Sequence, residues 1–163
     1  MDVADRVVLI TGASSGVGAA LASKLSAMGA RVVVNYSRSA EAAEAVVAQV
    51  TGAGGHAIAI QADVSDEVDC KRLVAETVAH FGQLDMLVNN AGTTTFVPHD
   101  ELEALTEDIW LKTLRVNLIG AFMMSREAAP HIEAAGGGEI VMTSSIASTT
   151  AAGSSIAYCA SKA

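Results

Sequence analysis

The stretch VVLITGASSGVG, residues 7–18, joins an apolar run to a glycine-rich segment. Residues 7–10 are all apolar and mostly β-branched, which predicts a short strand buried on both faces, as strands in parallel sheets are. From Val17 onward apolar residues recur at helical spacing, and Gly29 marks the predicted end of that helix. This part of the chain is therefore expected to form a strand, a glycine-rich turn and a helix.

The same alternation of strands and helices continues along the chain. Short apolar runs that predict strands occur at residues 31–36, 56–61, 84–88 and 139–142. Helical patterns occur at about 41–50, 70–81 and 105–132 (the last with one break or bend), and again from about Ser155. This pattern predicts an α/β fold of Rossmann type, in which a doubly wound parallel sheet carries helices on both faces. No repeat or interdomain linker interrupts it, so residues 1–163 are expected to form one domain.

Composition and charge narrow the class of protein. The 163 residues are 51% hydrophobic and carry a formal net charge of −8 without a basic cluster, so we expect no nucleic acid partner. Two cysteines, Cys70 and Cys159, do not make a disulfide framework and favour a reducing, cytoplasmic location. The histidines are scattered, so no metal site is predicted. Residues 140–161 carry no charge but are rich in serine and threonine, so no membrane span is expected, and no signal peptide is recognised.

Each predicted strand is followed by a polar or glycine-rich segment: TGASSGVG, NYSR, ADV, NNAG and TSS. Because the carboxyl ends of parallel strands meet at one edge of such a sheet, these segments predict a ligand site, and we favour a nucleotide. In the first segment the glycines permit positive φ and close approach, and the following helix offers free N–H groups to a pyrophosphate. The alternative is a tight turn that needs glycine for its geometry alone. The residues expected to bind here are Gly12, Ser14, Ser15, Gly16, Val17 and Gly18.

The segments after the second and third strands bear on which dinucleotide is bound. Asn35 stands where an acidic residue would bind the ribose 2′-hydroxyl of NAD, and Arg38 carries a charge that suits a 2′-phosphate. We therefore predict NADP(H) as the preferred cofactor and NAD(H) as the alternative, with Ser37 beside Arg38 in the site; a solvated loop position is the other interpretation of Arg38. Asp63 could accept from an adenine amino group, with Val64 against the ring, or it could cap the next helix.

The sequence IAYCASKA places a tyrosine and a lysine four positions apart. On a helix such residues share one face, so Tyr158 and Lys162 should point the same way. Ser144 and Ser145 follow the fifth strand, and a serine- and threonine-rich loop is predicted to lead from there to that helix, so these groups are expected to converge at the edge that carries the glycine-rich turn. Asn117 lies among apolar residues and needs hydrogen-bond partners; bonding to local backbone is the structural alternative for it.

Taken together, TGASSGVG, ADV, NNAG, the asparagine of RVNLIG, TSS and YCASK resemble the short-chain dehydrogenase/reductase family over the whole chain. The glycine spacing is similar to that of the branch with compact subunits, and NYSRSAEAAEAVV most resembles 3-oxoacyl carrier-protein reductases, which use NADP(H). The resemblance implies an oxidoreductase that transfers a hydride between a nicotinamide cofactor and a small-molecule carbonyl or secondary alcohol.

The resemblance also assigns roles to residues at matching positions. Tyr158 is implied as the general acid/base, and Lys162 as the cation that lowers the pKa of this tyrosine and binds the nicotinamide ribose. The family pattern assigns Ser145, in preference to Ser144, to the substrate oxygen, and Asn117 to a proton relay through water. The segment after the fourth strand is implied to line the cofactor through Asn90, Ala91 and Gly92, with Asn89 tying neighbouring strands.

Family members continue beyond the tyrosine–lysine helix with further strands and a substrate lid. We therefore expect residues 1–163 to be the N-terminal two-thirds of the family fold, with its C-terminal strands missing. The resemblance also implies a homodimer or homotetramer, for which Ala121, Phe122 and Ala128 would offer small or apolar surface. Two other interpretations stay open: a nucleotide-binding module without turnover, and a structural fragment with a vestigial site.

Overall fold

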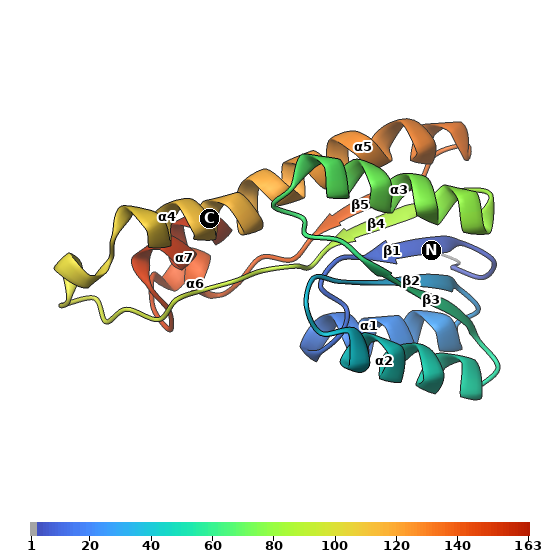
Figure 1. Ribbon diagram of the computed structural model, residues 1–163, viewed down its shortest axis with the longest axis horizontal. Helices are drawn as coiled ribbons and strands as arrows, with labels where there is room; N and C mark the ends of the chain where they lie inside the picture. Colours follow the sequence, from blue (N-terminus) through green and yellow to red (C-terminus); the bar gives the residue numbers. More distant parts are fainter. Residues whose placement is uncertain (1–2) are drawn as a thin grey trace.

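The computed structural model describes residues 3–163, and its centre is a sheet of five parallel strands (Figure 1). The strands lie in the order β3-β2-β1-β4-β5, so the chain runs outward from β1 to β3, crosses back, and continues on the other side of β1. This order confirms the predicted doubly wound Rossmann-type fold, with its point of reversal between β1 and β4. The strands are β1 (Val7–Ile10), β2 (Arg31–Tyr36), β3 (His56–Gln61), β4 (Met86–Asn89) and β5 (Glu139–Met142).

Two pairs of helices cover the two faces of the sheet (Figure 1). They are α1 (Gly16–Ala27) with α2 (Ala40–Gly52) on one face, and α3 (Glu67–Phe81) with α5 (Ala121–Ala134) on the other. Successive side chains of β1 serve the two layers in turn: Val7 and Leu9 join the core under α3 and α5, whereas Val8 and Ile10 join the core against α1 and α2. Both faces of the strand are therefore buried, as its uninterrupted apolar sequence predicted.

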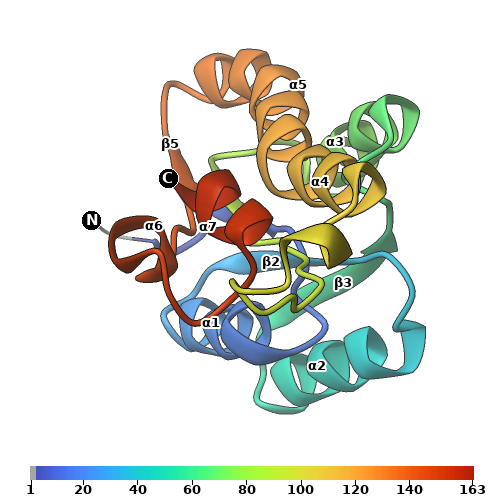
Figure 2. The same ribbon diagram turned by 90° about the vertical axis from the view of Figure 1, so that its left-hand side faces the viewer.

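The other helices lie beyond the carboxyl ends of the strands, where Figures 1 and 2 show α4, α6 and α7 grouped together. They are the 3₁₀-helix η1 (Leu102–Ala104), α4 (Glu107–Leu114), the π-helix η2 (Arg115–Gly120), α6 (Ala147–Thr150) and α7 (Ile156–Lys162). α4, η2 and α5 follow one another directly, so the long predicted helix continues through one π-helical segment and returns to α form without ending. α7 packs against α4, η2 and α6, which places it over the carboxyl edge of the sheet.

Two local predictions were wrong. The fourth strand begins at Met86 rather than Leu84, because the Asp85 carboxylate, and not a backbone carbonyl, accepts from the N–H of Val7 (2.7 Å). The serine- and threonine-rich segment after β5 was predicted as a loop, but it forms the short helix α6. Its hydroxyl groups donate to backbone carbonyls one turn earlier, which satisfies acceptors that a loop would leave to solvent.

Cys70 is a fully buried residue of the core under α3 and α5. Burial, with the carboxylates of Asp66 and Asp69 nearby, raises the pKa of Cys70 to about 12, so the thiol stays protonated and donates to the carbonyl of Val64 (3.2 Å). Among residues 3–163 no helix is long and apolar enough to cross a membrane. The same residues contain no group of three or more histidine, cysteine or acidic side chains arranged to hold a metal ion.

Candidate active site

The glycine-rich segment after β1 turns sharply before it enters α1. Gly12 and Gly16 have φ values of 62° and 56°, in the left-handed region that favours glycine. Gly12 also lies so close to the segment after β4 that an added Cβ would be 2.8 Å from the Cα of Ala91. At Gly18 an added Cβ would be 2.6 Å from the Nδ2 of Asn90. The three glycines therefore supply both a left-handed turn and close packing between β1, α1 and the end of β4.

The beginning of α1 presents hydrogen-bond donors at this edge. The hydroxyl of the N-cap residue Ser15 makes no capping bond, and Ser14 and Ser15 both line a cavity. The first N–H groups of a helix have no partner within the helix and carry partial positive charge, so they can hold an anionic group. Val17 was predicted to contact the cofactor, but 68% of its surface is exposed and it does not line the cavity.

The cavity beside α1, called here the first cavity, has a volume of about 440 Å³. It extends across the ends of β2 and β3 to the segment after β4. Two cations line it, Arg38 and Lys112, of which the sequence singled out only Arg38. The predicted binding residues in its lining are Gly12, Ser14, Ser15, Asn35, Ser37, Arg38, Asp63, Val64, Asn90, Ala91 and Gly92.

Asn35 lies near the end of β2, but its side chain is bonded to neighbouring backbone on every side. Its Oδ1 accepts from the N–H of Gly12 (3.1 Å), and its Nδ2 donates to the carbonyls of Ile60 (3.2 Å) and Ala62 (3.1 Å). The residue is 1% exposed, so its amide ties β2 to the segment after β1 and to the end of β3, and its hydrogens are not available to a cofactor. β2 extends one residue further, and Tyr36 is half-buried in the cavity lining instead.

Asp63, after β3, lines the first cavity and also organises its own turn. Its Oδ1 accepts from the backbone N–H (2.9 Å) and the hydroxyl (2.7 Å) of Ser65. The helix cap that was the alternative interpretation belongs to Asp66, whose carboxylate accepts from the N–H groups of Val68 and Asp69. Asp63 therefore does not cap α3, and its carboxylate stays at the cavity wall.

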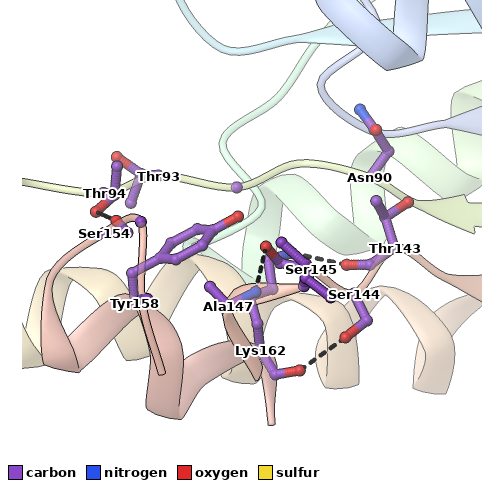
Figure 3. A pocket seen from close by; sticks show the side chains of 14 residues that line it. Asn90, Thr93, Thr94, Thr143, Ser144, Ser145, Ala147, Ser154, Tyr158 and Lys162 are labelled. Atoms are coloured by element: carbon purple, nitrogen blue, oxygen red, sulfur yellow. Dashed lines mark hydrogen bonds between the residues drawn. The ribbon is translucent and has the colours of Figure 1, made fainter. Parts of the chain in front are cut away.

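A second cavity, of about 460 Å³, adjoins the first, since Asn90, Gly92 and Thr93 line both. Tyr158 and Lys162 reach the second cavity from α7 (Figure 3). The predicted convergence is therefore present: one side of the shared segment faces the glycine-rich turn, and the other side faces the tyrosine–lysine pair.

Lys162 is half-buried between the segment after β4 and the end of β5. Its Nζ donates to the carbonyl of Thr143 (2.8 Å), and a Cβ added at Gly92 would lie 3.6 Å from this nitrogen. Burial lowers the pKa of Lys162 below its ordinary value. An ammonium group has three N–H donors, so this contact leaves Lys162 able to bind a ligand as well.

The two serines after β5 have different partners. Ser144 donates its hydroxyl to the backbone carbonyl of Lys162 (2.8 Å), which commits it to α7. The Oγ of Ser145 accepts from the N–H of Ala147 (3.2 Å), and no described residue accepts its hydroxyl hydrogen, which can therefore turn toward the cavity. Figure 3 shows the ring of Tyr158 directed toward the part of the cavity where Ser145 lies. The contacts thus support the preference for Ser145 over Ser144 as the residue that would hold the substrate oxygen.

The tie between neighbouring strands that was expected of Asn89 is made by Asn90, which also lines both cavities. Asn89 donates to the hydroxyl of Ser125 on α5 (3.0 Å). Asn90 donates to the carbonyls of Thr11 (2.9 Å) and Gly12 (3.0 Å), so Asn90, and not Asn89, ties β4 to the neighbouring β1. The reason is the alternation of side chains along an extended chain, which turns adjacent residues to opposite sides. Thr11, which sequence reasoning missed, adds to this tie by accepting from the N–H of Asn90 (3.0 Å).

Asn117 lies in η2 and is 7% exposed. Its side chain forms two bonds with the backbone of Thr93: Oδ1 accepts from the N–H (2.7 Å) and Nδ2 donates to the carbonyl (2.9 Å). These bonds are with backbone, as in the structural alternative for Asn117, but the backbone belongs to the distant segment after β4 and is not local. Nδ2 also donates to the hydroxyl of Ser161 on α7 (2.8 Å), a residue that sequence reasoning missed although it lies inside the YCASK motif.

A further set of contacts closes the far end of the second cavity. The hydroxyls of Thr94 and Ser154 lie 2.8 Å apart, and Nε2 of His99 lies 2.8 Å from the carbonyl of Ser154. A carbonyl only accepts, so this ring nitrogen carries a hydrogen. The segment after β4 is thereby held to the loop that enters α7. No signal in the sequence links these residues, because they are about sixty positions apart.

This fold and this site define a class of protein: Rossmann-type α/β proteins with a tyrosine–lysine pair at the carboxyl edge of the sheet. Residues 6–163 match the family model described as short chain dehydrogenase. The chain belongs to the short-chain dehydrogenase family.

Curated relatives and solved structures agree with this assignment. A putative ketoacyl reductase 2 of the granaticin polyketide synthase from Streptomyces violaceoruber is 46% identical over 155 residues, 95% of this chain and 61% of that protein. Versicolorin reductase 1 from Aspergillus parasiticus is 48% identical over 140 residues, 86% of this chain and 52% of that protein. This chain therefore spans half to three-fifths of the length of these relatives.

Two crystal structures extend the comparison to the fold. A putative short-chain dehydrogenase/reductase from Burkholderia xenovorans has a TM-score of 0.93 at 34% identity, covering 97% of this chain and 66% of that one. A short chain dehydrogenase from Burkholderia cenocepacia, in complex with NADP, has a TM-score of 0.87 at 40% identity, covering 99% of this chain and 64% of that one.

Proposed function

We propose that the protein is an NADP(H)-dependent oxidoreductase that interconverts a carbonyl compound and a secondary alcohol. The observation that carries the proposal is the pair of adjoining cavities, with a glycine-rich turn on one side of residues 90–93 and Tyr158, Ser145 and Lys162 on the other. Within the described residues, Lys162 is the only charged side chain in the lining of the second cavity, which suits an uncharged reacting group.

The first cavity fits a dinucleotide. Gly12 lines the cavity without a side chain, so its backbone can approach a pyrophosphate, and the hydroxyls of Ser14 and Ser15 can donate to it. Arg38 and Lys112 supply positive charge for a 2′-phosphate, and the NADP complex of the Burkholderia cenocepacia relative supports this preference. When bound, the nicotinamide supplies or accepts the hydride.

The residues around the second cavity would handle the proton. During reduction the hydroxyl of Tyr158 gives its proton to the carbonyl oxygen, and during oxidation the phenolate takes it back. Ser145 has an uncommitted hydroxyl hydrogen with which to hold that oxygen. The ammonium of Lys162 stabilises negative charge on the tyrosine. Asn117, which bonds to the backbone of Thr93, would support a relay of protons through water to solvent.

Cofactor titration and turnover, measured on the intact protein, test the proposal. NADPH should bind with a saturable change in its fluorescence, and its absorbance should decay only when a carbonyl substrate is added. A ketoacyl compound and versicolorin, which the names of two relatives mention, are the first substrates to try. Binding without turnover of any carbonyl would favour a nucleotide-binding module, and no binding of either NADPH or NADH would contradict the proposal.

Replacing Arg38 with alanine should weaken NADPH binding about tenfold, because a charge-assisted contact to the 2′-phosphate is lost, while NADH binding stays nearly unchanged. Dissociation constants for both cofactors, measured by fluorescence titration, give the comparison. Lys71→Ala is the matched control, since Lys71 is an equally exposed cation on α3 away from the first cavity. Equal weakening of NADPH and NADH by Arg38→Ala would show that Arg38 does not recognise the phosphate.

A homodimer or homotetramer is proposed through the outer face of η2 and α5. Leu118 and Phe122 are 55% and 62% exposed and lie one turn apart, so they form an apolar surface. Ala128, predicted to belong to this surface, is fully buried against the sheet and α3, because it lies on the opposite side of the helix.

Phe122→Glu should therefore lower the sedimentation coefficient of the intact protein at micromolar concentration by placing charge in the contact. Phe96→Glu changes an equally exposed phenylalanine elsewhere, at 69% exposure, and should leave the coefficient unchanged. A wild-type protein that sediments as a monomer would rule the contact out.

A further inference from the structure

We propose that Ser161 is a positioning residue for the reaction, because its hydroxyl couples α7 to Asn117 and, through Asn117, to the segment that separates the two cavities. The catalytic consequence rests on the proposed function; the coupling itself does not. The hydrogen bonds run from Thr93 through the side chain of Asn117 to the hydroxyl of Ser161 (2.8 Å), and from there to the carbonyl of Tyr158 (2.8 Å).

The donors and acceptors of this chain of bonds can be assigned without ambiguity. The N–H of Thr93 can only donate, so the atom of Asn117 that faces it is Oδ1, and the other is Nδ2. Both hydrogens of Nδ2 are then used, one by the carbonyl of Thr93 and one by Ser161. Ser161 accepts from Asn117, so its only hydrogen goes to the carbonyl of Tyr158. Each group thus has one arrangement, which fixes the orientation of the whole set.

Both side chains are removed from solvent, with Asn117 at 7% and Ser161 at 8% exposure. Water therefore cannot easily replace a partner that is taken away, and a lost hydroxyl would leave one hydrogen of Nδ2 unpaired. The amide could then satisfy itself only by moving. Such a movement would pull on Thr93, since the other contacts of Asn117 are both with its backbone.

The location of these bonds links them to the reacting groups. A Cβ added at Gly92 would be 3.6 Å from Oδ1 of Asn117 and 3.6 Å from Nζ of Lys162, so Asn117 and Lys162 flank the same backbone unit. Gly92 and Thr93 line both cavities. Ser161 belongs to α7 and Asn117 to η2, so the hydrogen bond between their side chains limits how α7 rotates over the sheet.

Ser161→Ala should therefore lower kcat about tenfold, since small displacements of catalytic groups have large effects on rate, and leave the dissociation constant of NADPH nearly unchanged. Ser161→Thr keeps the hydroxyl and should recover most of the rate. Ser26→Ala is the matched control: Ser26 is also 8% exposed, but it lies on α1 away from both cavities. Melting temperatures of all variants show whether any loss of rate is due to unfolding.

A double-mutant cycle with Asn117→Ala identifies the route of the effect. If Ser161 acts through Asn117, removing its hydroxyl in the Asn117→Ala background should cost no further rate. Full additivity of the two losses, wild-type kcat in Ser161→Ala, or no recovery in a normally stable Ser161→Thr would each overturn the proposal.

Amide hydrogen exchange at Thr93 tests the coupling without any assay of turnover. The N–H of Thr93 bonds to Asn117, so Ser161→Ala should speed its exchange at least several-fold while Ser26→Ala should not. Unchanged exchange would overturn the coupling even in an active enzyme. If instead the wild type binds no nicotinamide cofactor and reduces no carbonyl, the proposed function fails, and faster exchange in Ser161→Ala would still establish the coupling.

Discussion

Replacing Tyr158 with phenylalanine should lower kcat for carbonyl reduction by about a hundredfold or more, the usual scale for loss of a general acid. The substitution keeps the ring and removes only the oxygen. Tyr158 is half-buried in the second cavity, and no described residue bonds to its hydroxyl, so the fold should not depend on that atom. The dissociation constant of NADPH should change little, because the glycine-rich turn and the first cavity are untouched.

Steady-state turnover at saturating NADPH, together with cofactor titration, measures both quantities. The only other tyrosine in the sequence, Tyr36, provides the control. Tyr36 lines the first cavity, so Tyr36→Phe can affect cofactor affinity but should leave kcat close to that of the wild type. Near-normal carbonyl reduction by Tyr158→Phe would show that Tyr158 is not the general acid. The proposed cofactor site would not be affected by that result.

Replacing Asn35 with leucine should reduce the free energy of unfolding by about 3 kcal/mol or more. The buried amide bonds to Gly12, Ile60 and Ala62, and each backbone group left without a partner costs about 1–3 kcal/mol. For a chain of this size, a loss of about 3 kcal/mol corresponds to a melting temperature lower by roughly 6–12 °C. Asn35→Asp should also be destabilising, because its negative charge would face the carbonyls of Ile60 and Ala62.

Urea and thermal unfolding of the intact protein test this expectation. Gln49→Leu is a suitable control, since it also exchanges an amide for leucine but at an exposed position of α2. Wild-type stability in Asn35→Leu would mean that the ends of β1, β2 and β3 are held together by other contacts. Cofactor preference gives a second comparison: the Asn35 variants should lose NADPH and NADH affinity together, unlike Arg38→Ala.

The fold could be predicted from sequence because its signals are local. Four consecutive apolar residues such as 7–10 indicate a strand buried on both faces, and the order of strands and helices then leaves few topologies. Gly12 and Gly16 could be placed in a turn for the same reason: the backbone conformation that they adopt depends on the residues beside them. The resemblance to the family predicted that Tyr158, Lys162 and Ser145 share one site, and in the structure all three line the second cavity.

What could not be predicted depends on partners far away in the sequence. The acceptors of Asn35 lie at positions 60 and 62. The direction of its side chain follows from the alternation of side chains along β2, and an error of one residue in that alternation reverses the predicted direction. The same uncertainty explains why the tie between strands was expected of Asn89 and is made by Asn90. Ser161 looks like an ordinary small helical residue until η2 is packed beside it.

The π-helical turn η2 sets the rotational phase between α4 and α5. A π turn closes its hydrogen bond one residue later than an α turn, so it holds one extra residue, and each residue of an α-helix rotates the chain by about 100°. If residues 115–120 were regular α-helix instead, α4 would be rotated by about 100° relative to α5, whereas deleting one residue here would give a regular α-helix with both flanks facing as they do now. With the turn, one continuous helix can aim Asn117 at Thr93 and still turn Met124 and Ala128 to the core. The extra residue of η2 therefore shifts the sequence of α4 by one position relative to that of α5 while the directions of the two helices are kept.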